Sequence, residues 1–144
     1  MHVALAEAHA ALSEAEVPVG AVIVRDGTLL ARAHNRREQL PDPTAHAEIL
    51  ALRDAAKAVG NWRLPGSTLY VTLEPCPMCA AAIVQARVER VVYGADDPRL
   101  GAAGSRFHVF AEQQEHRVDV IGGICENACS ELLQAFFRDR RPGR

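Results

Sequence analysis

Residues of the types that bind and use zinc occur in two short motifs of this chain. His46 and Glu48 form a His-x-Glu pair, and Cys76 and Cys79 form a Pro-Cys-x-x-Cys motif. Imidazole and thiolate are ligands that zinc prefers, and a zinc ion with only three protein ligands keeps its fourth position open for water. Glu48 is then free to move a proton of that water. The motifs predict a hydrolytic zinc centre in which His46, Cys76 and Cys79 are the ligands and Glu48 is the proton shuttle.

A structural zinc site is the alternative interpretation of the same cysteines. A closed structural site takes four protein ligands, whereas the two motifs supply three. Candidates for a fourth ligand are His34, His108, His116, Cys125 and Cys129. A structural site gives no reason for a glutamate two residues after the histidine, so the catalytic interpretation is favoured. Cys125 and Cys129 have the spacing of small residues packed on one face of a helix.

The elements that must position these residues alternate between helices and strands, which implies an α/β layered sheet. Both motifs fall at expected helix N-termini, where partial positive charge and free N–H groups favour thiolates. The expected elements are a helix over 2–15, a β-hairpin over 20–34 with its turn at Asp26-Gly27, a helix over 45–59 with Thr44 as N-cap, a strand over 68–73, a helix over 77–86, a strand over 90–93, irregular or short helical structure over 95–117, a strand over 118–121 and a helix over 126–140.

The global composition suits one globular domain over residues 1–144. The chain is 49% hydrophobic and 24% charged, and it has no apolar run of about 18 residues. Its first residues lack a basic segment ahead of a hydrophobic stretch, so we expect neither a signal peptide nor a membrane span. These features predict a cytoplasmic protein with reduced thiols.

A local basic cluster near the C-terminus contrasts with the net charge of −2. The overall charge argues against a protein that coats nucleic acid without selectivity. The cluster consists of Arg138, Arg140, Arg141 and Arg144, interrupted by Asp139. It is either a solvated helix end, where arginines suit the helix dipole, or a contact for phosphate groups.

Stretches around these motifs carry a resemblance that covers nearly the whole chain. They read Asp-Pro-Thr-Ala-His-Ala-Glu over 42–48, Gly-Ala-Ala-Gly-Ser over 101–105 and Phe-Phe-Arg-Asp-Arg-Arg over 136–141. The zinc motifs alone mark the zinc-dependent deaminases of nucleobases and nucleosides, the cytidine-deaminase-like superfamily. With its flanking stretches, the sequence closely resembles the bacterial tRNA-specific adenosine deaminases.

This resemblance implies a fold, an activity and a set of partners. The fold would be a three-layer α/β/α cytidine-deaminase-like fold with a mixed five-stranded sheet flanked by helices. The protein would be a homodimer with one zinc ion per subunit. The activity would be hydrolytic deamination of the wobble adenosine to inosine in the anticodon loop of an arginine tRNA, with zinc-bound hydroxide as nucleophile and Glu48 as proton shuttle. By matching position, the substrate-binding residues would be Asn35, Ala47, Asp97, Arg138, Arg140 and Arg141.

Two other functions compete with this one. The first is zinc-dependent deamination of a free base or nucleoside such as guanine, cytosine or cytidine. The second is a nucleic-acid-binding module with a structural zinc. The sequence also departs from its relatives where Arg99-Leu100 replaces a common Lys-Thr, where Ala81 replaces glycine, and at Pro77. None of these departures touches an expected zinc ligand or Glu48.

Overall fold

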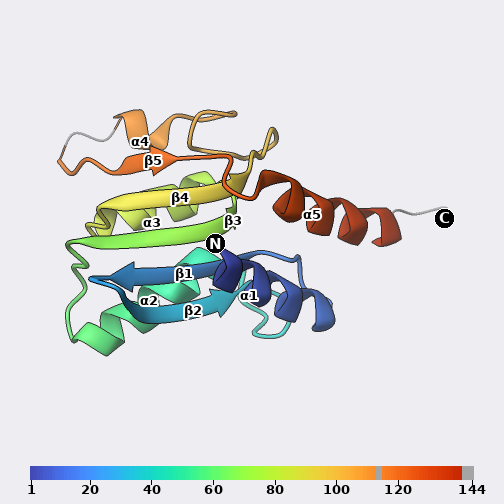
Figure 1. Ribbon diagram of the computed structural model, residues 1–144, viewed down its shortest axis with the longest axis horizontal. Coiled ribbons are helices and arrows are strands. Elements are labelled where there is room, and N and C mark those ends of the chain that lie inside the picture. Colours follow the sequence, from blue (N-terminus) through green and yellow to red (C-terminus); the bar gives the residue numbers. More distant parts are fainter. Residues whose placement is uncertain (113–114, 141–144) are drawn as a thin grey trace.

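The computed structural model describes residues 1–112 and 115–140, which form a mixed five-stranded sheet between two layers of helices (Figure 1). The strands are β1 (Gly20–Arg25), β2 (Thr28–His34), β3 (Ser67–Leu73), β4 (Arg90–Ala95) and β5 (Asp119–Ile121). The helices are α1 (His2–Ser13), α2 (Ala47–Val59), α3 (Pro77–Gln85), α4 (Val109–Glu112) and α5 (Glu126–Arg140). The predicted three-layer α/β/α architecture is confirmed.

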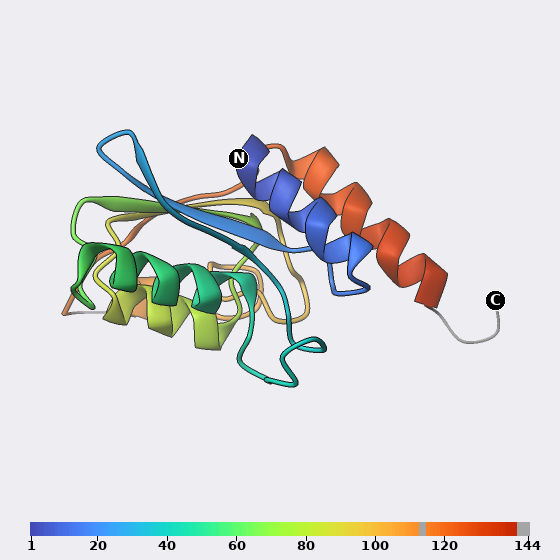
Figure 2. The same ribbon diagram turned by 90° about the horizontal axis from the view of Figure 1, so that it is seen from below.

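The sheet has the order β2-β1-β3-β4-β5. Strand β1 pairs antiparallel with β2 and β3, whereas β3, β4 and β5 run parallel. Helices α2 and α3 lie side by side on one face, and α1 and α5 cover part of the other (Figure 2). Between the sheet and α2 and α3 lies a core of fully buried aliphatic side chains, among them Ile23, Leu69, Val71, Ile83 and Val91. This core holds the N-termini of α2 and α3 together at one end of the strands.

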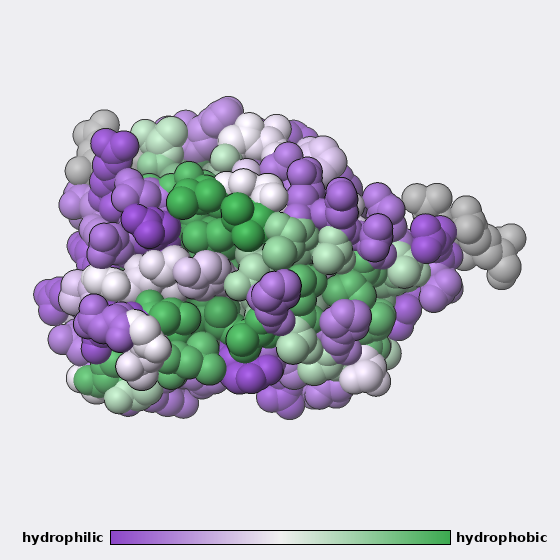
Figure 3. All heavy atoms as spheres, viewed as in Figure 1, coloured by the Kyte–Doolittle hydropathy of each residue, from purple (hydrophilic) through white to green (hydrophobic). Residues whose placement is uncertain are grey.

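The sheet face that α1 and α5 leave partly uncovered is apolar. Apolar side chains gather over its strands, with charged side chains around them (Figure 3). At its two edge strands, Leu29 is 45% exposed and Ile121 is 43% exposed. Within the described residues, none of the helices combines the length and the apolarity needed to cross a membrane.

The predicted element boundaries agree with the structure within two residues, but one cap was wrong. The hairpin turn is confirmed, since Asp26 and Gly27 both have positive φ angles, 51° and 74°, as a type I′ turn requires. Thr44 does not cap α2, because its hydroxyl donates to Asp42 Oδ1 at 2.8 Å. The N-cap is His46, which has an extended backbone at φ −70° and ψ 153°.

Helix α5 crosses β4 at Gly94, where the two elements come too close for a side chain. A Cβ at Gly94 would overlap Cys129 Sγ and lie 2.7 Å from the Thr72 carbonyl oxygen. We expect Gly94→Ala to lower the free energy of unfolding by about 1–3 kcal/mol because α5 must shift. Urea denaturation measures this decrease, and the same substitution in a Cys129→Ala background should cost less. Equal decreases in both backgrounds would contradict the close packing of Cys129 on β4.

Candidate active site

The predicted metal ligands meet at the N-termini of α2 and α3. His46 is the N-cap of α2, Cys76 is the N-cap of α3, and Cys79 lies in the first turn of α3. His46 Nδ1 lies 3.6 Å from Cys76 Sγ and 3.4 Å from Cys79 Sγ. The three ligand atoms all lie within 4.8 Å of one another. His46 and the two cysteines, 30 and 33 positions further along the chain, therefore form one group that could hold a metal ion.

The protonation of this group suits a soft divalent cation. A hydrogen bond with Cys79, together with the nearby His46, lowers the pKa of the Cys76 thiol to about 4. The pKa of Cys79 is raised, because it shares that hydrogen bond and is buried. Cys76 is therefore the more readily deprotonated of the two thiols. One nitrogen and two sulfur ligands favour zinc among the common metals, and metal binding releases the proton of a thiol ligand.

Glu48 is a buried carboxylate beside the same group. It is 4% exposed and lies in the first turn of α2. His46 and Glu48 would point to nearly opposite sides of a regular helix, but His46 precedes the helix in an extended conformation, so both can face one site. Burial raises the pKa of Glu48 to about 7. A carboxylate with a pKa near 7 can accept and return a proton at neutral pH.

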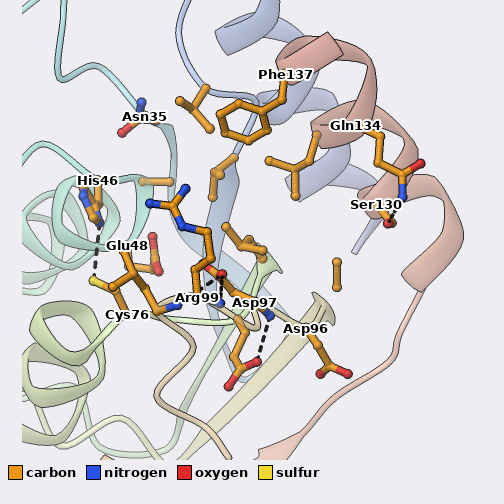
Figure 4. A pocket seen from close by; sticks show the side chains of 18 of the residues that line it. Asn35, His46, Glu48, Cys76, Asp96, Asp97, Arg99, Ser130, Gln134 and Phe137 are labelled. Atoms are coloured by element: carbon orange, nitrogen blue, oxygen red, sulfur yellow. Dashed lines mark hydrogen bonds between the residues drawn. The ribbon is translucent and has the colours of Figure 1, made fainter. Parts of the chain in front are cut away.

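A cavity of about 760 Å³ opens above Glu48 (Figure 4). Of the residues predicted for the site, those that line it are Asn35, His46, Ala47, Glu48, Cys76, Asp97 and Arg138. Cys79 is fully buried and is absent from the cavity lining. Arg140 is also absent from the lining, and its guanidinium lies 3.8 Å from the centroid of the Phe136 ring. Arg141 lies outside the described residues.

Comparisons with known proteins place this fold and site in one family. A family model for MafB19-like deaminases matches residues 1–141. The tRNA-specific adenosine deaminases of Bacillus subtilis and Agrobacterium fabrum are 50% and 51% identical to the chain over 142 residues, which are 98% of this chain and 88% and 93% of theirs. The chain belongs to the tRNA-specific adenosine deaminases.

A solved structure supports the same assignment for this tRNA-specific adenosine deaminase. It comes from a study of A-to-I editing by tRNA:A34 deaminases at the wobble position of transfer RNA. The two chains share 51% identity and a TM-score of 0.88, covering 92% of this chain and 97% of the other. The family that the flanking stretches predicted is confirmed.

Several side chains that sequence reasoning did not assign to the site also line the cavity of this deaminase. Arg37 and Arg99 add positive charge beside Arg138. Phe137 projects from α5 toward the cavity, across from the loop that carries Asp97 and Arg99 (Figure 4). For Arg99, its position two residues after Asp97 was the available signal for its place in the site.

Proposed function

We propose that this enzyme hydrolyses the wobble adenosine of a tRNA anticodon loop to inosine, with an arginine tRNA as substrate. One observation carries the proposal. Three zinc-type ligands converge beside a buried Glu48, and His46, Cys76 and Glu48 line a cavity, in a chain half identical to tRNA-specific adenosine deaminases. A free-base deaminase needs no basic rim around its pocket, whereas an RNA substrate brings phosphates to such a rim. Arg37, Arg99 and Arg138 form that rim.

The proposed chemistry divides between a metal ion and the protein. His46, Cys76 and Cys79 would hold one zinc ion per subunit, since their three ligand atoms converge within 4.8 Å. When bound, zinc lowers the pKa of water at its open position toward ~7 and so supplies a nucleophile. Glu48 would take a proton from the attacking water and give it to the ring nitrogen beside the amine-bearing carbon. It would then take the hydroxyl proton of the addition product and pass it to the departing ammonia as the carbonyl of inosine forms.

The walls of the cavity would hold the extruded nucleotide. Asn35 is 6% exposed and lines the cavity, where its amide can hydrogen-bond the base or the ribose. Ala47 would offer its backbone near the reacting atoms, and Asp97 would face the ribose. The Phe137 ring is 45% exposed, so a neighbouring base can stack on it.

The basic end of α5 would contact anticodon-loop phosphates. We expect the double change Arg138→Gln and Arg140→Gln to weaken stem-loop binding while leaving kcat nearly unchanged. For each phosphate of the single-stranded loop that the variant no longer binds, the slope of log Kd against log salt should fall by about 0.7. Fluorescence anisotropy over a salt series measures that slope. Arg117→Gln is the control, because this arginine side chain is 91% exposed next to β5 and lines no part of the cavity. An unchanged slope in the double variant would show that the basic end of α5 does not contact the RNA phosphates.

Three wider features complete the proposal. Residues 1–144 would form a single zinc-dependent deaminase domain. The enzyme would act in the cytoplasm, where bacterial tRNA is modified, and as the homodimer that its family resemblance implies. Analytical ultracentrifugation of the metal-loaded protein tests the dimer, and a monomer at micromolar concentration would contradict it.

The decisive experiment is a substrate comparison. The metal-loaded enzyme is incubated with an arginine-tRNA anticodon stem-loop that carries a wobble adenosine, and separately with adenosine, guanine and cytidine. Inosine from the stem-loop alone supports the proposal. Activity confined to a free base or nucleoside would replace it with the small-substrate alternative, and metal binding without any deamination would favour a structural zinc.

A further inference from the structure

Glu74 is a buried carboxylate that has no role in the proposed chemistry. It follows β3 directly, two residues before Cys76, and is 2% exposed. Its Oε1 accepts hydrogen bonds from the Asp97 N–H at 3.0 Å and from the Ser105 hydroxyl. Its Oε2 accepts from the Ala103 N–H at 2.9 Å and from the Ser105 N–H at 3.1 Å. One side chain thus binds both ends and the middle of the loop over 97–105.

Backbone hydrogen bonds join the same loop to the segment that carries Cys76. The Ala102 N–H donates to the Pro75 carbonyl at 2.8 Å, and the Glu74 N–H donates to the Ala95 carbonyl at 2.9 Å. The loop over 97–105 and the segment over 74–76 are therefore one hydrogen-bonded unit. Within it, a proposed metal ligand and a residue of the cavity wall have a fixed relative position.

Gly101 gives the Glu74 carboxylate the space it occupies. A Cβ at Gly101 would overlap the carboxylate carbon and Oε1 of Glu74. The stretch Gly-Ala-Ala-Gly-Ser over 101–105 thus has a physical explanation: it makes room for this carboxylate with its first residue and donates to it from Ala103 and Ser105.

The ionised form of Glu74 suits this arrangement. All four groups that contact the carboxylate are donors, namely the N–H groups of Asp97, Ala103 and Ser105 and the Ser105 hydroxyl. An ionised carboxylate only accepts hydrogen bonds, so it can satisfy all four donors at once.

Asp97 lines the cavity together with Arg99 and Leu100 of the same loop. Its Oδ1 accepts from the Arg99 N–H at 3.0 Å and from the Leu100 N–H at 3.2 Å, and its N–H is held by Glu74 (Figure 4). The place of the Asp97 side chain therefore depends on the conformation of the whole loop.

We propose that Glu74 is a positioning residue of the deamination reaction. It holds the loop over 97–105 in a fixed position relative to the segment over 74–76, so that Asp97 contacts the nucleotide. This inference rests on the proposed function for its substrate. Glu74 also lines the cavity, but both of its carboxylate oxygens accept hydrogen bonds from the loop, so it acts through Asp97.

Glu16 provides a matched control, because it lies behind Asn35, which lines another wall of the cavity. It is fully buried, and its carboxylate accepts from the Glu38 N–H at 3.2 Å, the Gln39 N–H at 2.8 Å and the Asn35 amide at 3.4 Å. Glu16 thus supports Asn35 in the way that Glu74 supports Asp97. Removal of either carboxylate perturbs the site, but only Glu74 should act through Asp97.

The kinetic test is a double-mutant cycle with full-length, metal-loaded enzyme on the anticodon stem-loop. Glu74→Gln replaces an acceptor with a donor, and we expect kcat/KM to fall about 10- to 100-fold with metal content unchanged. In an Asp97→Ala background the same change should cost less than about threefold, because the residue it positions is gone. Glu16→Gln should cost the same factor in both backgrounds. Equal effects of Glu74→Gln with and without Asp97 would overturn the proposal, as would loss of metal from Glu74→Gln.

A second measurement does not need activity. Amide hydrogen exchange of Asp97, Ala103 and Ser105 should become at least about tenfold faster in Glu74→Gln, with α2 unchanged. Gly101→Ala, whose Cβ would displace the carboxylate and would also lie 2.5 Å from the Asp97 carbonyl oxygen, should give the same pattern if Glu74→Gln does not fold. Unchanged exchange in these variants would overturn the proposal. A wild-type enzyme inactive on the stem-loop would instead defeat the proposed function, and the exchange data would still decide whether Glu74 fixes the loop.

Discussion

Glu48→Ala is expected to keep its metal and its fold and to lose about 10³-fold or more in kcat. Acid–base catalysis by one positioned side chain contributes about 10²–10⁴-fold, and Glu48 would serve several proton transfers of one turnover. The side chain is 4% exposed at the cavity, and its burial raises its pKa to about 7, so it can accept and return a proton at neutral pH. Single-turnover inosine formation and metal analysis of the same preparation measure the two outcomes.

Glu48→Gln is the matched control, since it keeps the shape of the side chain and removes the titrating group. We expect it to be as inactive as the alanine variant. Loss of metal from either variant would show that Glu48 is a ligand. Retained turnover in both variants would show that another group carries out the proton transfers.

The convergence of the three proposed metal ligands could be predicted from sequence because its signal is local. Cys76 and Cys79 are three residues apart at the start of a helix that Pro77 opens, and His46 directly precedes another helix. Residue type and spacing are enough to recognise such a group. The prediction that Thr44 caps α2 was wrong for an equally local reason. The Thr44 hydroxyl donates a hydrogen bond to Asp42, and the N-cap of α2 lies two residues later.

The support of the site could not be predicted in the same way. Glu74 binds backbone N–H groups 23 to 31 residues away. Every residue except proline offers the same N–H, so a carboxylate that binds the backbone leaves no residue-type signal at its partners. Glu16 meets Glu38 and Gln39 through such groups as well. Such contacts follow only from the folded loop. The proposed metal ligands could therefore be predicted from the sequence, whereas the hydrogen bonds that support the site could not.

Removal of a proposed metal ligand is the second change from which we expect a large loss of activity. Cys79→Ala should abolish stoichiometric metal binding and deamination, because the remaining nitrogen and sulfur ligands cannot complete a stable zinc site. The fold should also become less stable, since a metal present at a thousand times its Kd contributes about 4 kcal/mol to the native state. Thermal unfolding with and without a chelator measures this: the Tm of the wild type should fall on chelation, whereas that of the variant should not respond.

Cys129→Ala separates removal of a ligand from removal of a buried thiol. Cys79 and Cys129 are 0% and 1% exposed, so both substitutions remove a buried sulfur, but only Cys79 belongs to the convergent group. Cys129→Ala should therefore keep its metal, its activity and its response to the chelator, and only its packing against Gly94 should weaken. If Cys79→Ala also kept a full complement of metal, the third ligand would have to come from elsewhere, and the cysteine pair at the start of α3 would lose its place in the proposed mechanism.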